Sequence, residues 1–160
     1  MQKTLRMLLV GTVLAIGLSA VDLAADAPDP VVGTWTLNVA KSKFNPGPAP
    51  KSQTRTYAAT ADGITLTLNG IAADGSPISG QSTYKYDGKD YPITGSPNYD
   101  SLSLTRVNAS TVKSKVRKAG KVVGSAKRTI SAHGKVMTLW TKVTDAKGAM
   151  HDDVAVYDKQ

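Results

Sequence analysis

Residues that favour tight turns recur along this chain at intervals that leave room only for short strands. Glycine preceded by Asp, Ala, His or Lys occurs at positions 62–63, 74–75, 87–88, 119–120, 133–134 and 147–148. Such pairs supply the positive φ that tight hairpins need. Strands of about ten residues joined by short turns predict a meander, in which neighbours in sequence pair in space. No helical period appears beyond the N-terminal segment, so we predict an all-β fold.

Apolar and polar residues alternate between these turns. Ile64, Leu66 and Leu68 are separated by polar residues, and Leu102 and Leu104 follow the same pattern. Each such strand has one face for a core and one for water. A long meander exposes two edges unless it closes. We therefore predict a single antiparallel meander β-barrel of about eight to ten strands.

The N-terminus has the pattern of a cleaved targeting segment. Lys3 and Arg6 precede a mostly apolar segment at 7–16, and small residues follow as far as Ala27. This order is typical of a secretory signal peptide. An apolar segment of about ten residues is too short to span a bilayer of roughly 30 Å as a helix. We predict a cleaved signal peptide over 1–25, a barrel domain over 26–160, and a periplasmic or secreted protein that is not integral to the membrane.

The first predicted strand carries a motif with a family resemblance. Gly33-Thr34-Trp35 begins a strand in which Leu37 and Val39 share the face of Trp35. Its position at the first strand of an all-β meander resembles the opening of the calycins, the superfamily of lipocalins and intracellular fatty-acid-binding proteins. The longer stretch 29–48 resembles small secreted bacterial proteins of lipocalin-like type. The resemblance implies a barrel that is open at one end, binds a small hydrophobic molecule and is closed at its floor by Trp35.

Several family features are missing or altered. The proline-rich segment 45–50 is unsuited to the helix-turn-helix lid of fatty-acid-binding proteins. Their carboxylate-binding Arg-x-Tyr lies near the C-terminus, where this chain has Val154-Ala155-Val156-Tyr157 without an arginine. Calycins also tend to pack a late arginine over the opening tryptophan, a place for which Arg128 is the candidate. The resemblance therefore implies the fold and one end of the barrel, and no ligand-binding set.

The candidate ligand site follows from alternation along the strands. Small residues at Gly80, Ser82, Gly124 and Ala126 leave room inside a barrel. The alternative is that the large aromatic residues fill the interior. A register error of one residue would turn any strand's set outward. Trp35 is expected at the floor, an acidic headgroup could meet Arg106 or Arg128, and the cavity wall is expected to include Tyr84, Tyr86, Leu102, Leu104 and Trp140.

A basic hairpin is the strongest local charge feature. Lys113, Lys115, Arg117 and Lys127 lie close together, and a turn at Gly120 sets Lys113 opposite Lys127. Like charges in direct opposition destabilise a strand pair, so we interpret this patch as kept for an anionic envelope lipid or polysaccharide. The alternative is a solvated face that prevents edge pairing. Nucleic acid is not an expected partner, because export removes the chain from it and the patch lacks interleaved aromatic residues.

Catalytic motifs are nearly absent. The chain has no Cys and no Glu, which excludes thiol chemistry and glutamate acid–base catalysis. His133 and His151 flank a predicted strand at 135–144 and should lie roughly 30 Å apart, too far to share a metal ion. His151 is expected at a solvated strand start. We predict no enzyme, cofactor or metal, and an exported barrel for a small hydrophobic or amphipathic ligand. The alternative is an envelope protein that binds anionic polymers through the basic hairpin.

Overall fold

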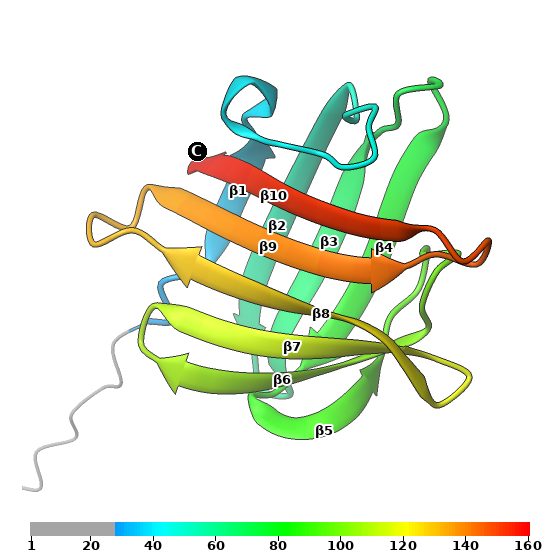
Figure 1. Ribbon diagram of the computed structural model, residues 1–160. Helices are drawn as coiled ribbons and strands as arrows, with labels where there is room; N and C mark the ends of the chain where they lie inside the picture. Colours follow the sequence, from blue (N-terminus) through cyan, green and yellow to red (C-terminus); the bar gives the residue numbers. More distant parts are fainter. Residues whose placement is uncertain (1–27) are drawn as a thin grey trace, which may run out of the picture.

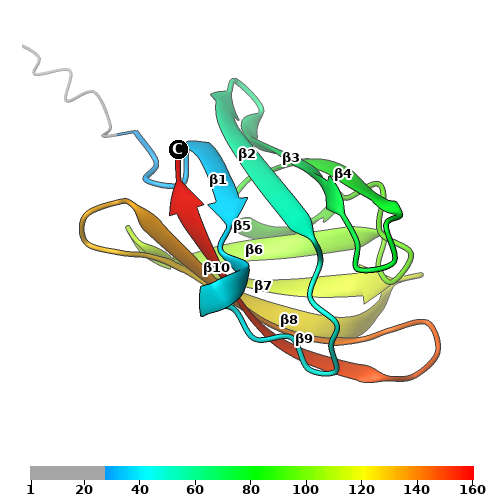
Figure 2. The same cartoon turned by 90° about the horizontal axis from the view of Figure 1, so that it is seen from above.

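The computed structural model describes residues 28–160, so the predicted signal peptide lies outside the described residues. A short 3-10 helix, η1 (Val39–Lys41), follows the first strand. Figures 1 and 2 show the strands wrapped into a barrel. They are β1 (Gly33–Leu37), β2 (Ser52–Thr60), β3 (Gly63–Ile71), β4 (Pro77–Tyr84), β5 (Asp87–Pro92), β6 (Ser101–Asn108), β7 (Thr111–Lys118), β8 (Lys121–Ile130), β9 (Val136–Thr144) and β10 (Met150–Lys159).

The strands form one antiparallel sheet in the order β4-β3-β2-β1-β10-β9-β8-β7-β6-β5. Each strand pairs with the strand that follows it in the sequence, except that β4 does not pair with β5. These two strands are the edges of the sheet. One isolated bridge between Gln81 and Thr94 and a hydrogen bond from Ser82 Oγ to the Pro92 carbonyl (2.8 Å) link these edges. The predicted all-β meander barrel is confirmed, and it is nearly closed.

The alternate residues of each strand point into the barrel and build its core. Ile64 and Leu66 of β3, for example, are 7% and 6% exposed, because their register places them beside Tyr84 and Tyr57 of the flanking strands. The threonines between them face outward and pair across strands, as in the 2.9 Å contact between the hydroxyls of Thr65 and Thr83. The period-two pattern thus separates a largely apolar inner face from a polar outer face.

Trp35 is completely buried at one end of the barrel. Its indole Nε1 donates a 2.7 Å hydrogen bond to the carbonyl of Val31, in the segment that enters β1. Lys159 Nζ lies 5.0 Å from the centre of the Trp35 ring. The expectation that Arg128 would cover this ring is therefore wrong, since Lys159 pairs directly with Trp35 in the register of β1 with β10 whereas Arg128 contacts tyrosines.

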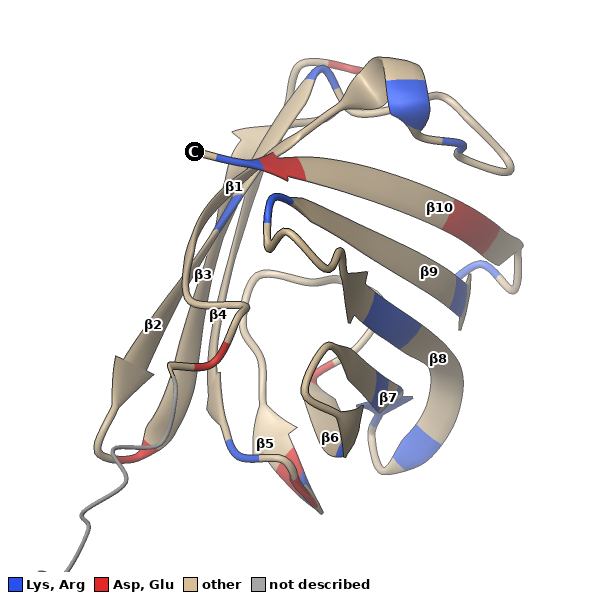
Figure 3. Ribbon diagram, turned by 90° about the vertical axis from the view of Figure 1, so that its left-hand side faces the viewer, with Lys and Arg blue, Asp and Glu red and all other residues tan. Residues whose placement is uncertain are grey.

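Charged residues lie mainly on the outer face and in the turns. Lysines and arginines occur on β7, β8 and β9, the strands that curve across one side of the barrel (Figure 3). Within residues 28–160, no helix has the length and apolar character needed to cross a membrane.

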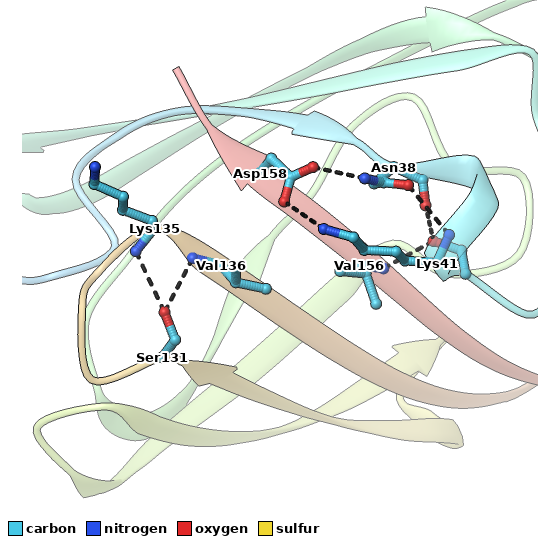
Figure 4. Close-up of polar contacts among 8 residues, drawn as sticks. Asn38, Lys41, Ser131, Lys135, Val136, Val156 and Asp158 are labelled. Carbon is cyan, nitrogen blue, oxygen red and sulfur yellow. Dashed lines mark hydrogen bonds and ion pairs between the residues drawn. The ribbon is translucent and has the colours of Figure 1, made fainter.

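The first strand, β1, pairs with the last strand, β10 (Figure 4). Asn38 Nδ2 donates to a carboxylate oxygen of Asp158 (2.7 Å), and the other oxygen lies 3.6 Å from Lys41 Nζ. The hydroxyl of Ser42 accepts a hydrogen bond from the Val156 backbone N–H (2.9 Å). These contacts hold η1 against the last strand, so that the proline-rich segment after η1 runs past one end of the barrel.

Candidate ligand cavity

A cavity of about 290 Å³ occupies the barrel interior above Trp35. Apolar side chains from β3, β6, β7 and β9 form much of its wall, among them the predicted residues Leu102 and Leu104. Tyr84 and Arg128, which were also predicted, line it as well. Loop residues Phe44, Ile93, Asn98 and Tyr99 border the cavity at the end opposite Trp35. The interior is therefore not filled by its aromatic residues.

Trp140, which was predicted to form part of the wall, lies outside the cavity. Trp140 points away from the cavity, is 37% exposed and has Lys127 Nζ 4.4 Å from its ring centre. Strand β9 carries apolar residues on both faces, and its register turns Met137, Leu139 and Val143 inward, so Trp140 must face out. The sequence pattern alone had no means of choosing between these two faces.

Arg106 and Tyr86 also lie outside the cavity, at the end closed by Trp35. Arg106 Nη2 lies 2.5 Å from Asp29 Oδ2, and its guanidinium carbon lies 4.1 Å from the centre of the Tyr86 ring. Burial by itself would raise the pKa of Asp29, but its hydrogen bonds with the Val31 N–H and Arg106 hold that pKa below its usual value. Arg106 is thus already engaged with a carboxylate and does not meet a ligand in the cavity.

Arg128 forms the deep polar group of the cavity and is only 7% exposed. Its Nη1 donates to the Tyr84 hydroxyl (3.2 Å) and its Nη2 donates to the Tyr86 hydroxyl (2.8 Å). The ring of Tyr57 lies 5.4 Å from its guanidinium carbon. Burial alone would lower the pKa of Arg128, but the surrounding phenol oxygens raise it above its ordinary value, so the side chain stays charged. Burial raises the pKa of Tyr84 and Tyr86, which keeps both phenols protonated at neutral pH.

A second arginine, Arg55 on β2, lines the cavity and was missed by the sequence analysis. Its Nε donates to the Tyr157 hydroxyl (3.0 Å) and to Gln53 Oε1 (3.3 Å), and the Tyr157 hydroxyl donates in turn to Gln53. Burial raises the pKa of Tyr157. Because Gln53 and Arg55 give β2 a polar inner face, the usual apolar alternation is absent there. The C-terminal tyrosine thus meets its arginine from another strand, a pairing that no local motif could reveal.

The two guanidinium groups have no acidic partner in the part of the chain that the structure describes. None of the ion pairs found within residues 28–160 includes Arg55 or Arg128. Asp153 lines the cavity wall, but its Oδ1 accepts a hydrogen bond from the Asn45 backbone (2.9 Å). The cavity lining therefore holds two guanidinium groups and one carboxylate, a net positive charge.

His151 lies in the wall of the cavity rather than at a fully solvated strand start. It lines the cavity, its side chain is 33% exposed, and its Nε2 lies 3.1 Å from Asp145 Oδ2. The expectation of an exposed His151 is therefore wrong: its pairing with Val143 in the register of β9 with β10 turns both side chains inward.

Comparison with known proteins supports the fold. The sequence matches no protein-family model, and no curated protein matches it either. Among solved structures, zebrafish ileal bile acid-binding protein complexed with cholic acid is similar, with 9% identity, 82% of this chain and 99% of that chain covered, and a TM-score of 0.50. Lobster apocrustacyanin A1 matches with 16% identity, 83% of this chain and 62% of that chain covered, and a TM-score of 0.41. The likeness to the bile acid-binding protein shows that this barrel has the lipocalin-like, calycin-type fold.

Proposed function

We propose that the protein binds a small amphipathic molecule with an anionic end inside the barrel. The observation that carries this proposal is Arg55, a charged side chain that lines an otherwise largely apolar cavity without an acidic partner among residues 28–160. Burying a cation costs free energy unless an anion or several hydrogen bonds compensate it. A carboxylate, sulfonate or phosphate in the cavity would supply that compensation.

The hydrogen bonding of Arg55 leaves room for such a group. Its hydrogen bonds to Gln53 and Tyr157 use Nε, and the Tyr57 phenol also interacts with the guanidinium, which leaves further donors on the two terminal nitrogens. No buried side-chain nitrogen or oxygen among the described residues lacks a partner, so no terminal nitrogen of Arg55 is both fully buried and unpaired. A planar guanidinium with two parallel donors matches an oxyanion well.

The cavity also limits the size and polarity of the ligand. A volume of about 290 Å³ is at the lower end of the roughly 300–1,000 Å³ typical of small-molecule sites. The apolar wall of Leu66, Leu102, Leu104 and Val112 suits the hydrophobic part of the molecule. The zebrafish protein of the same fold is complexed with cholic acid, itself an amphipathic carboxylic acid. This similarity supports the class of ligand and leaves its identity to experiment.

The first experiment is a native mass spectrum of the full chain produced in an exporting bacterial host and purified without detergent. The proposal includes export with cleavage near Asp26 and no catalytic activity, and the spectrum reads the mature mass directly. An additional mass of a few hundred daltons, lost on gentle activation, is the expected result for a retained ligand. A bare protein that also fails to bind decanoate in titration would contradict the binding proposal, and an unprocessed chain would contradict export.

A charge-specific test uses decanoate and decanol, which share a chain and differ in the headgroup. Wild-type protein should bind decanoate more tightly, and Arg55→Met should weaken decanoate binding by about 10- to 100-fold, since a hydrogen bond to a charged group contributes about 1.5–3 kcal/mol. Decanol binding should change little. The matched control is Arg117→Met, because Arg117 lies on the outer face and pairs with Asp90. Equal affinities for acid and alcohol in wild type would refute the role of Arg55.

A further inference from the structure

The outer face of the barrel carries a second hollow, which shares the lining residues Ser114, Ser125, Ala126 and Thr141 with the ligand cavity. A groove of about 580 Å³ lies over β6–β9, and outward-facing side chains such as Lys113, Lys115 and Trp140 form part of its lining. Irregular register within the pairs β5–β6, β6–β7 and β7–β8 accompanies this shape. Such bulges bend strands and increase their twist. They explain how the outside of a barrel, which is usually convex, becomes concave here.

The groove is basic because lysines occupy neighbouring positions on β7, β8 and β9. Lys113 pairs in register with Lys127, and Lys127 pairs with Trp140. Lys115 is two residues from Lys113 on the same face, about 7 Å along the strand. Arg117 and Lys142 also line the groove, but each pairs with an aspartate. No carboxylate among the described residues pairs with Lys113, Lys115 or Lys127, which leaves three unneutralised cations together.

Trp140 adds an aromatic surface to this charge. Its ring is 37% exposed at the groove, and Lys127 Nζ lies 4.4 Å from the ring centre. Hydroxyl side chains, among them Ser125 and Thr105, line the groove between the cations. Two directly opposed lysines destabilise a strand pair, and an exposed tryptophan on a polar face gains little from folding. The arrangement therefore lowers the stability of the protein without a ligand, and a bound anion would offset that loss.

The shape of the groove discriminates among polyanions. A flat membrane surface meets protruding groups, whereas these lysines line a concavity. Single-stranded nucleic acid binds on successive aromatic residues, and Trp140 is the one aromatic side chain in the lining of this groove. A linear acidic polysaccharide offers spaced carboxylates for the lysines, hydroxyls for Ser125 and its neighbours, and an apolar sugar-ring face for Trp140.

We propose that this groove binds a segment of an acidic polysaccharide. The uronate carboxylates contact Lys113, Lys115 and Lys127, and one sugar ring stacks on Trp140. The three lysines and Trp140 lie on the opposite face of the sheet from Arg55 and Arg128, so the two ligands are held by different charged groups.

The test measures binding of a short polygalacturonate oligomer by isothermal titration calorimetry at low and at physiological salt. Its fully methyl-esterified form is the matched neutral ligand. Replacing Lys113, Lys115 and Lys127 together by serine should weaken polygalacturonate binding by about tenfold or more, because exposed ion pairs contribute up to about 1 kcal/mol each. Replacing Lys51, Lys85 and Lys147 together by serine removes the same charge outside the groove. This control should change the affinity for polygalacturonate by less than about twofold.

Several results would overturn the proposal. They are no binding of polygalacturonate, equal binding of the ester, equal losses in the two triple variants, or tighter binding of an oligothymidylate or of anionic vesicles. Trp140→Phe separates sugar stacking from charge: it should weaken binding by about threefold while leaving the salt dependence unchanged. Loss of fold does not confuse the test, since removing the Lys113–Lys127 repulsion should leave the triple serine variant at least as stable as wild type. Decanoate binding should also survive in that variant.

Discussion

Arg128 is expected to act mainly as a brace for the closed end of the barrel, and a double-mutant cycle with Tyr84 tests this. The Tyr84 hydroxyl accepts a 3.2 Å hydrogen bond from Arg128, and Tyr84 is 1% exposed. A hydrogen bond to a charged group contributes about 1.5–3 kcal/mol to the free energy of unfolding. Tyr84→Phe should therefore cost about 2 kcal/mol, because the buried guanidinium loses one of its two phenol acceptors.

Arg128→Met should cost a similar amount by a different route. The substitution removes the two hydrogen bonds from the guanidinium to the phenols, and with them the cost of burying the charge. It also leaves the Tyr84 hydroxyl without a partner, a penalty of about 1–3 kcal/mol. In the double variant neither the guanidinium nor the Tyr84 hydroxyl is left unpaired. The two substitutions together should then cost about 1–2 kcal/mol less than the sum of the single effects.

Urea unfolding at neutral pH, followed by circular dichroism, measures this coupling. With an m-value of about 2 kcal/mol per molar, each single substitution should lower the midpoint by about 1 M. The matched control pair is Arg128→Met with Thr65→Val, because Thr65 shares a hydroxyl contact with Thr83 and has none with Arg128. Additive effects for Arg128 and Tyr84, within about 0.3 kcal/mol, would refute the brace and favour a direct ligand role for Arg128.

Two further predictions concern the closed end and the open seam. Hydrogen bonding with Arg106 and the Val31 N–H lowers the pKa of Asp29, so its stabilising effect should be full above the unfolded pKa of about 4 and lost as pH falls through the folded value. Asp29→Asn should thus destabilise at pH 7, with the gap to wild type closing near pH 2 in urea titrations; a gap that persists there would contradict this. Gly95→Ala should lower the melting temperature more than Gly120→Ala: both glycines have positive φ, but a Cβ at Gly95 would lie 1.9 Å from a carbonyl oxygen of β4, whereas one at Gly120 would meet nothing within 4 Å. Equal shifts would show that the β4–β5 seam yields freely.

Local patterns were sufficient for the architecture. The spacing of turn residues set strand lengths, and alternation assigned Leu102, Leu104 and Tyr84 to the inner face, where the structure has them. These inferences succeed because a short turn forces its two strands to pair and a strand has a strict two-residue period. The buried Trp35 likewise lies where the resemblance placed it, at one end of the barrel.

The failures share a physical cause, which is that they depend on contacts with other strands or segments and not on the local pattern. Trp140 lies on a strand with apolar residues on both faces, so only pairing with β8 and β10 decided which face is inside. Arg106 had the correct alternation but met Asp29, which is 77 positions away in the chain. The register of β10 with β9 likewise decided that His151 faces inward.

The sequence by itself thus determined an all-β meander, its approximate strands and a basic hairpin, because each depends on residues close together in the chain. Only the tertiary structure decided that the interior is hollow, that Arg55 meets Tyr157 from a strand 102 positions away, and that the basic hairpin borders a groove with an exposed tryptophan. The pairing of β1 with β10 places β2 and β10 on either side of β1, and bulges bend the outer face. The chemistry of both proposed sites arises from that pairing and that bending, which no single stretch of residues encodes.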